Sequence, residues 1–175
     1  MKWFKHFWVP IIVLGILSVP VLAQKEVGTM PSDMRWYSLK EAQELAKEND
    51  KKILIFGHAD WCPYCRKMRK EVYPDSTIQA TIEAHYYPVI INSESETIIE
   101  FQGKELKEGE FAAYLRLQSL PTHYFVTGDG DILGAQPGFL PPEVFKPLLR
   151  FVGTDAYGKM KFEEFIENEE AENQR

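Results

Sequence analysis

The sequence of 175 residues contains very little cysteine: Cys62 and Cys65 are its only two, three positions apart. Small secreted domains that depend on disulfides for stability usually carry more cysteines, spread along the chain. A bridge that closes so short a loop constrains the unfolded chain only weakly. The scarcity of cysteine therefore argues against a disulfide-stabilised scaffold and indicates that this pair is present for its reactivity.

The sequence also lacks an excess of positive charge, since 20 Lys and Arg face 26 Asp and Glu, for a net charge of −6. Loss of residues 1–23 would remove the two charges of Lys2 and Lys5 and leave −8. Nucleic-acid binding needs basic patches, so this acidic balance argues against a nucleic-acid partner. Internal repeats are missing as well, which excludes a repeat architecture.

Long uncharged apolar runs are rare, and the one that is present lies at Phe7–Leu22. Lys2 and Lys5 precede this run and Ala23 follows it, a pattern that predicts a signal peptide over residues 1–23. The run is about 16 residues long, whereas roughly 20 are needed to span a bilayer. We therefore expect a cleaved, exported, periplasmic protein without a permanent membrane span; an uncleaved N-terminal anchor is the alternative.

The rest of the sequence divides into three segments. Residues 24–37 show no periodicity and are predicted to form an irregular lead-in, residues 38–153 a domain, and residues 154–175 a helical extension with an acidic tail. Within the domain, the apolar spacing predicts five helices, at 39–49, from about 62 to Pro74, through 78–82, at 110–118 and at 142–152. It predicts four strands, at 53–56, 87–91, 122–126 and 131–135, and a small hairpin over 98–106. This alternation predicts an α/β fold with a central mixed β-sheet covered by helices on both faces.

The two cysteines lie between the predicted strand 53–56 and the start of the following helix, which is where a redox pair is expected. Unpaired N–H groups and the helix dipole at such a start favour the thiolate, which is the reactive form of cysteine. Pro63 and Tyr64 separate the cysteines, so Cys65 can reach Cys62 within the first helical turn. We expect both sulfurs to be exposed there.

The segment from Phe56 to Cys65 (Phe-Gly-His-Ala-Asp-Trp-Cys-Pro-Tyr-Cys) resembles the active-site segment of thioredoxins. Leu120-Pro121-Thr122, followed by Phe125, Gly130 and Gly138, resembles the second half of that family. The resemblance covers about residues 38–153 and implies a three-layer thioredoxin-like fold. It also implies a cis proline at Pro121 packed beside the disulfide, and a Leu120 backbone that pairs with an extended substrate segment.

The hairpin near 98–106 and the tail motif over 161–165 are similar to periplasmic thioredoxin-related proteins of the SoxW-like group, which accompany bacterial sulfur-oxidation systems. The Cys-Pro-Tyr-Cys sequence also occurs in glutaredoxins. Trp61, the helix before the first strand and the missing paired glycines after the proline strand argue against a glutathione site. By the resemblance, the residues that support the cysteine pair are Asp60, Trp61, Pro63, Tyr64, Pro121 and His58.

Two departures from the thioredoxin pattern concern proton transfer to Cys65. The buried acid of the family, six residues before the first cysteine, falls at Phe56, and its buried lysine falls at Ile90. Asp60 or a water is the candidate replacement. His58 stands where the family has an aromatic residue, and packing is favoured over a direct role at the sulfurs.

The remaining charged and titratable residues receive simpler interpretations. The basic residues that follow Cys65 are predicted to form a solvated helix face, and they are Arg66, Lys67, Arg69 and Lys70. His85 and His123 are isolated in the sequence and are expected to serve packing or solvent contact.

The predicted function is reduction of disulfides in exported client proteins, with Cys62 as nucleophile and Cys65 as resolving thiol. No cofactor is expected beyond the Cys62–Cys65 disulfide, and the expected partners are disulfide-containing clients and a membrane dithiol donor of the DsbD type. An oxidase or isomerase with the same site is an alternative, because reduction potential sets the direction. A copper or zinc module using Cys62, Cys65 and His58 is another, although zinc usually takes four ligands. A structural disulfide is the third.

Overall fold

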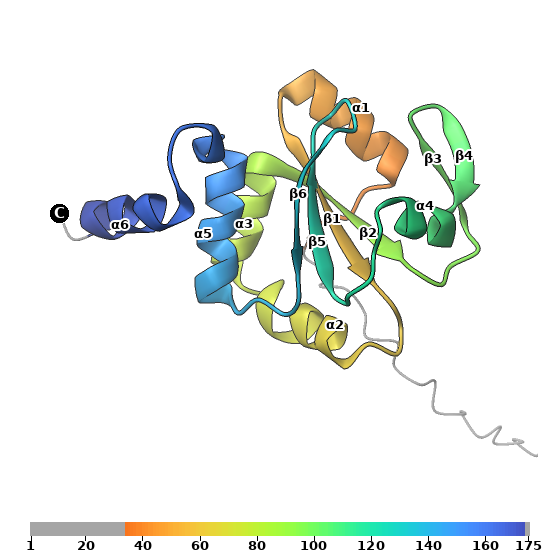
Figure 1. The fold of residues 1–175 in the computed structure, drawn as a ribbon, viewed down its shortest axis with the longest axis horizontal. Coiled ribbons are helices and arrows are strands. Elements are labelled where there is room, and N and C mark those ends of the chain that lie inside the picture. The colour runs from red at the N-terminus through yellow and green to blue at the C-terminus, as the bar shows by residue number, and fades with distance from the viewer. Residues whose placement is uncertain (1–33, 174–175) are drawn as a thin grey trace, which may run out of the picture.

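The computed structural model describes residues 34–173 of the chain (Figure 1). The predicted signal peptide 1–23 and most of the predicted lead-in 24–37 lie outside the described residues, so both stay predictions. Between residues 34 and 173, no helix combines the length and apolar character needed to cross a membrane.

A four-stranded mixed sheet forms the centre of the domain, in the order β2-β1-β5-β6. Its strands are β1 (Lys52–His58), β2 (Tyr86–Asn92), β5 (Thr122–Val126) and β6 (Ile132–Pro137). The first two run parallel, whereas β5 is antiparallel to both β1 and β6. Every residue of β1 and β5 is buried, which explains their continuous apolar character. The predicted mixed sheet is confirmed.

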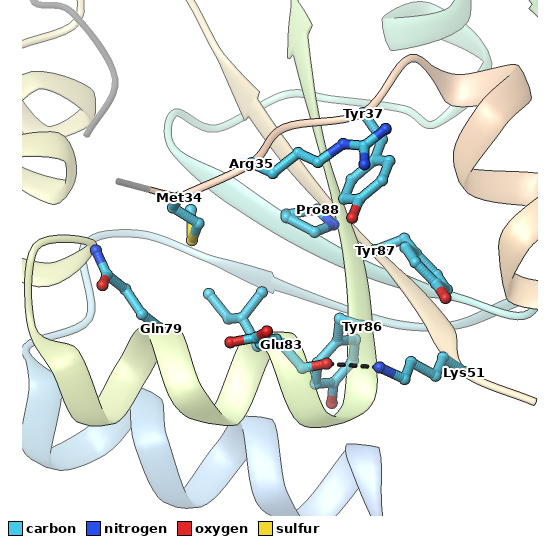
Figure 2. A pocket seen from close by; sticks show the side chains of 10 residues that line it. Met34, Arg35, Tyr37, Lys51, Gln79, Glu83, Tyr86, Tyr87 and Pro88 are labelled. Carbon is cyan, nitrogen blue, oxygen red and sulfur yellow. Dashed lines mark hydrogen bonds between the residues drawn. The ribbon is translucent and has the colours of Figure 1, made fainter. Parts of the chain in front are cut away.

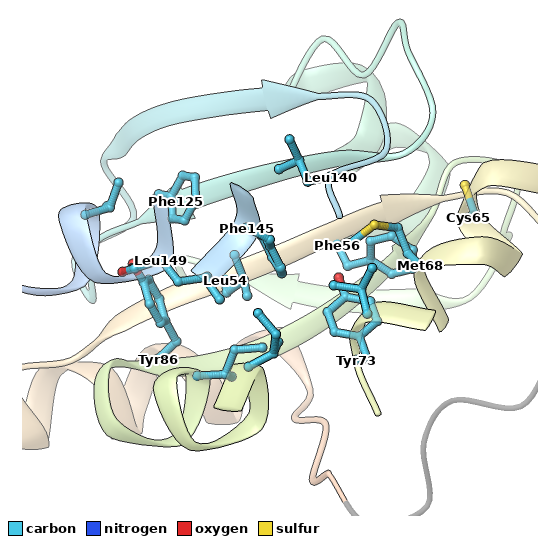
Figure 3. Packing of buried hydrophobic residues seen from close by; sticks show 14 of the residues in the cluster. Leu54, Phe56, Cys65, Met68, Tyr73, Tyr86, Phe125, Leu140, Phe145 and Leu149 are labelled. Atoms are coloured by element: carbon cyan, nitrogen blue, oxygen red, sulfur yellow. The ribbon is translucent and has the colours of Figure 1, made fainter. Parts of the chain in front are cut away.

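Helices after the cysteine pair cover one face of the sheet (Figures 1 and 3). They are α2 (Pro63–Lys67), the π-helical turn η1 (Met68–Val72), α3 (Ser76–His85) and α5 (Pro142–Gly153). Leu54 and Phe56 point from β1 into this core, where they meet Met68, Phe145 and Leu149. The alternate residues of β1 point to the opposite face, as the two-residue period of a strand requires.

The opposite face is covered by α1 (Leu39–Asn49), α4 (Glu108–Tyr114) and the hairpin of β3 (Ile98–Phe101) and β4 (Lys104–Lys107). The N-cap of α1 is Ser38, whose hydroxyl accepts the Glu41 N–H at 3.2 Å. The Glu41 carboxylate binds Arg35 at 2.6 Å. Together these elements complete the helix–sheet–helix sandwich of an α/β domain.

Several segments differ from the predicted lengths; the short helix predicted through 78–82, for example, is the ten-residue α3. The helix predicted over 110–118 is α4, which ends at Tyr114; Arg116 has a left-handed φ of 55°, a conformation that stops a helix. The short helical pattern of the tail extends further, into α6 (Phe162–Asn173) after the single turn η2 (Ala156–Gly158). Ring contacts of 5.2 and 5.4 Å from Phe151 join α5 to α6.

Candidate active site

The cysteine pair lies where β1 gives way to α2. Cys62 is the N-cap of α2, and its Sγ accepts the Cys65 N–H at 3.1 Å. Pro63 occupies the first helical turn, where its missing N–H has no helical partner to lose. The two sulfurs form a disulfide with the Cα atoms 5.3 Å apart. The predicted helix start at Cys62 thus places one sulfur directly over the free N–H groups of the helix.

The expected exposure of both sulfurs is wrong for the disulfide form. Cys65 is fully buried and Cys62 is only 2% exposed. Both belong to the core that contains Ala59, Met68 and Phe56, because the first turn of α2 packs against the end of the sheet (Figure 3). Cys62 is the one of the two that retains measurable exposure.

Exposed aromatic side chains form a rim around the pair. Trp61 is 61% exposed and Tyr64 is 57% exposed. The Trp61 Nε1–H donates to Glu94 Oε1 at 2.8 Å, which fixes the indole. The ring centroids of Tyr64 and Phe139 lie 6.4 Å apart, and Lys67 Nζ lies 4.4 Å above the Phe139 ring. Exposed aromatic groups of this kind are typical of surfaces that contact other proteins.

The loop before β5 reaches the same end of the sheet as the cysteines. Gly57 of β1 is the Cα partner of Thr122, so the segments that follow β1 and precede β5 are neighbours. The peptide bond between Leu120 and Pro121 is cis, and Leu120 packs against the core that holds both cysteines. The Pro121 carbonyl accepts the Gly138 N–H at 2.8 Å, which ties this loop to the end of β6.

Phe56 occupies the position at which the family resemblance implies a buried carboxylate. Phe56 and Ile90 are Cα partners across β1 and β2, and both pack into the core of the cysteines. Asp60, the suggested replacement, is exposed, and its carboxylate accepts Asn92 Nδ2 at 3.3 Å. The side chain of Asp60 is therefore engaged at the surface of the site, away from the buried position of the family acid.

His58 and Arg69 form a buried contact behind the pair. The His58 ring is 6% exposed and stacks on Phe56, with centroids 5.6 Å apart and planes 6° apart. Arg69 Nη1 lies 3.4 Å from His58 Nδ1. Burial, with help from the Arg69 charge, lowers the pKa of His58, so the ring is neutral at pH 7. A guanidinium beside Nδ1 also disfavours a metal cation there.

The prediction that all four basic residues after Cys65 form a solvated face is wrong for one of them. Arg69 is only 5% exposed, whereas Lys67 and Lys70 are exposed as expected. Arg69 is buried because it shares the inward face of the helix with Cys65 and Met68. The signal was present in the spacing, since Arg69 lies four residues after Cys65.

A second buried polar pair joins distant parts of the sequence. Tyr73 Oη and His123 Nε2 lie 2.9 Å apart, and both side chains are buried. Burial lowers the pKa of His123 to about 3 and raises that of Tyr73 well above its ordinary value. The expectation of a packing role for His123 agrees with its place in the core, but no sequence signal pointed to Tyr73.

A hollow of about 400 Å³ lies away from the cysteines. It opens between the start of the described chain, β2 and α3 (Figure 2). Tyr37 and Tyr87 line it, and Lys51 Nζ donates to the Glu83 carbonyl at 2.7 Å across its mouth. Across residues 34–173, no three His, Cys, Asp or Glu side chains gather as metal ligands would.

Residues 39–153 match the sequence profile of the thioredoxin-like domain family. The chain belongs to the thioredoxin-like family. Together with the Cys62–Cys65 disulfide, this membership makes it a thiol–disulfide oxidoreductase of the thioredoxin fold. The narrower SoxW-like assignment stays a prediction.

Individual relatives of this thioredoxin-like protein agree in fold. A thioredoxin from Thermus thermophilus is 27% identical, with a TM-score of 0.55 over 68% of this chain and 86% of that one. A thioredoxin-fold protein from Helicobacter pylori gives 0.59 at 23% identity, over 83% and 89% of the two chains, which shows likeness of fold alone. Disulfide bond reductase DsbH from Chlamydia pneumoniae is 27% identical over 111 residues. That match spans 63% of this chain and 66% of the relative, just under two thirds of its length.

Proposed function

We propose that this protein is an exported reductase of disulfides in client proteins. The observation that carries the proposal is the Cys62–Cys65 disulfide at a helix start, beside the loop of Pro121 and inside an aromatic rim. The chlamydial relative is named a disulfide bond reductase, which supports the reductive direction. The predicted signal peptide over residues 1–23 supports export.

In the first step, the Cys62 thiolate attacks one sulfur of a client disulfide. The client S–S bond breaks, a bond forms from Cys62 Sγ to the attacked sulfur, and the other client sulfur leaves as a thiolate. Cys62 serves as the nucleophile because it caps the N-terminus of α2, whereas Cys65 is fully buried within the first turn. The N–H groups at the start of α2 stabilise its thiolate. Trp61 and Tyr64 supply exposed apolar contact for the client.

In the second step, Cys65 resolves the mixed disulfide. Its sulfur attacks Cys62 Sγ, the Cys62–Cys65 bond forms, and the second client sulfur leaves as a thiolate. Two electrons have then passed to the client, whose two thiolates take up the protons lost by the dithiol. The extended client segment pairs with the Leu120 backbone before Pro121, as the family resemblance implies.

A second dithiol must restore the reduced pair after each turnover. We assign this role to a membrane dithiol donor of the DsbD type, which would pass two electrons to the Cys62–Cys65 disulfide. Exchange between a dithiol and a disulfide needs no metal or organic cofactor. Because the protein is proposed to be exported, its clients would be exported proteins that carry disulfides.

The direct test measures insulin disulfide reduction by the purified protein with a dithiol as electron source. The Cys62→Ser variant should lose the activity, because it lacks the nucleophile. The Cys65→Ser variant should complete the first step and accumulate a mixed disulfide with its client, which identifies the client by mass spectrometry. Tyr114→Phe, an exposed change outside the site, is the control and should retain wild-type activity.

The opposite direction would appear as oxidation of reduced, unfolded proteins by the Cys62–Cys65 disulfide. A redox titration against glutathione decides between the two, since about 30 mV corresponds to about 1.4 kcal/mol for this couple. A potential well above that of the glutathione pool would contradict the reductase and favour an oxidase. Retained insulin reduction by Cys62→Ser would remove Cys62 from the mechanism.

A further inference from the structure

Arg69 is a buried cation that forms no ion pair within residues 34–173. Its side chain is 5% exposed, and among these residues its polar contact is with His58 Nδ1 at 3.4 Å. Its buried Nε and Nη2 atoms have no hydrogen-bond partner in the described part of the chain. Guanidinium groups stay protonated in proteins, so a full positive charge lies in the core. A buried charge without an opposite charge nearby strongly destabilises a fold. An anion close to Arg69 would offset this cost.

The groups that face Arg69 supply no such anion. Burial lowers the pKa of His58 and raises that of Tyr73, so both are neutral at pH 7. Arg66 on the same helix is a like charge that contacts the Asp60 carbonyl. The Asp60 carboxylate is the acid whose charge acts on Arg69, but it is exposed and binds Asn92.

The helical segment after the cysteines carries Arg69 close to Cys65 in the sequence. Arg69 follows Cys65 by four residues, in the π-helical turn η1 that continues α2, and both side chains are buried. Side chains four residues apart on a helix are neighbours, with Cβ atoms about 5 to 6 Å apart. Cys65, fully buried, is therefore the sulfur that shares the surroundings of Arg69.

We propose that Arg69 is the counter-ion of the thiolate that Cys65 carries during thiol–disulfide exchange. This inference rests on the proposed function and names a positioning residue for it. The disulfide is neutral, so it offers Arg69 no opposite charge in the oxidised form that the structure shows. Reduction creates the anion that pairs with it.

The step at which Arg69 acts follows from the order of attack. When a donor thiolate attacks Cys62 Sγ, a donor–Cys62 bond forms and the Cys62–Cys65 bond breaks. Its electron pair remains on Cys65 Sγ as a thiolate, and a second donor thiolate then releases Cys62 and leaves the donor oxidised. A leaving thiol of lower pKa leaves faster, so a cation beside Cys65 accelerates this step. Arg69 holds the charge and accepts no proton, unlike the carboxylate of the family pattern.

The test measures the acidity of Cys65 directly. In a Cys62→Ser background, Cys65 is the one remaining thiol of the chain, and its ionisation can be followed by the ultraviolet absorbance of the thiolate against pH. Replacement by Arg69→Met should weaken the acidity of Cys65 by about tenfold or more, because a nearby opposite charge has an effect of that size. Arg69→Lys, which retains the charge, should recover most of it.

Lys70→Met is the matched control. It removes the same charge from the adjacent position of the same helix, but from an exposed side chain, and should change the acidity of Cys65 less than twofold. Arg69→Gln repeats the test if Arg69→Met does not fold. Unchanged acidity in both Arg69 variants, or an equal change in Lys70→Met, would overturn the proposal.

The two proposals fail separately. The titration uses a variant without Cys62, so its result does not depend on client reduction. Absence of insulin reduction by the wild-type protein would remove the proposed reductase and leave the pairing of Arg69 with Cys65 measurable. A dithiol donor should also reduce the disulfide of Arg69→Met at least several-fold more slowly than that of the wild-type protein.

Discussion

The buried Tyr73–His123 pair makes the stability of this protein depend on pH. Folding takes the His123 ring from an ordinary pKa near 6.5 to about 3, because burial disfavours the charged imidazolium. The unfolded chain therefore binds one more proton than the folded chain at intermediate pH. Because the pKa of His123 is lower in the folded state than in the unfolded state, its contribution to stability is complete above about pH 6.5 and declines as the pH falls towards 3.

The magnitude follows from the width of that window. One pH unit corresponds to about 1.4 kcal/mol for one proton. Between about pH 7.5 and 4.5, the unfolded chain holds the extra proton only below about pH 6.5, over roughly two pH units. Acidification across this range should therefore lower the free energy of unfolding by roughly 3 kcal/mol through His123. The pKa values of His58 and His85 are also lowered by burial, so they act in the same direction. A variant is needed to isolate the contribution of His123.

The suitable variant is the double change Tyr73→Phe with His123→Leu, which removes both members of the hydrogen bond and leaves neither unpaired. Urea unfolding of the oxidised wild-type protein and of the variant should be measured from about pH 7.5 to 4.5. The stability of the variant should rise by roughly 3 kcal/mol relative to the wild type over that range, since other groups contribute equally to both. A difference that stays constant across the range would refute a buried neutral His123.

Two further changes test packing away from the cysteines. Tyr86→Phe removes a buried hydroxyl that donates to an α5 carbonyl at 2.6 Å, and should lower the free energy of unfolding by about 1 to 3 kcal/mol. Tyr114→Phe, which changes an exposed side chain, should change that free energy by less than about 0.5 kcal/mol. Gly128→Ala would place its Cβ 2.8 Å from the Lys47 backbone nitrogen and should destabilise by about 1 to 3 kcal/mol; Gly134→Ala, with open space, should stay within about 0.5 kcal/mol. Denaturant unfolding checks both pairs, and equal effects within either pair would contradict the packing described.

The parts of the fold that rest on local pattern were predictable from the sequence. The apolar run after Lys52 predicted β1, and Pro63 beside Cys62 predicted the start of α2, because both signals act within a few residues. The early end of α4 was not predictable in the same way. Leu115 continues the helical spacing, but Arg116 has a left-handed φ, which ends the helix. An arginine gives no local signal for that conformation.

The candidate site divides along the same line. The two cysteines and Pro121 carry recognisable motifs, but the Tyr73–His123 pair joins residues 50 positions apart and depends on how α5 and β5 close over η1. Exposure was the least predictable property. The sequence predicted exposed sulfurs, whereas both cysteines are packed into the core where the first turn of α2 meets the sheet.

Phe56 and Ile90 stand where the family resemblance implies a buried acid and a buried lysine, and they are Cα partners on neighbouring strands. Both side chains are apolar, so neither position carries a buried charge. Removal of one member alone would have left an uncompensated charge, at a cost of about 3 to 5 kcal/mol. Arg69 is a buried cation that forms no ion pair among residues 34–173 of the oxidised protein. The thiolate that Cys65 carries when the disulfide opens, four residues away, is the anion that compensates its charge.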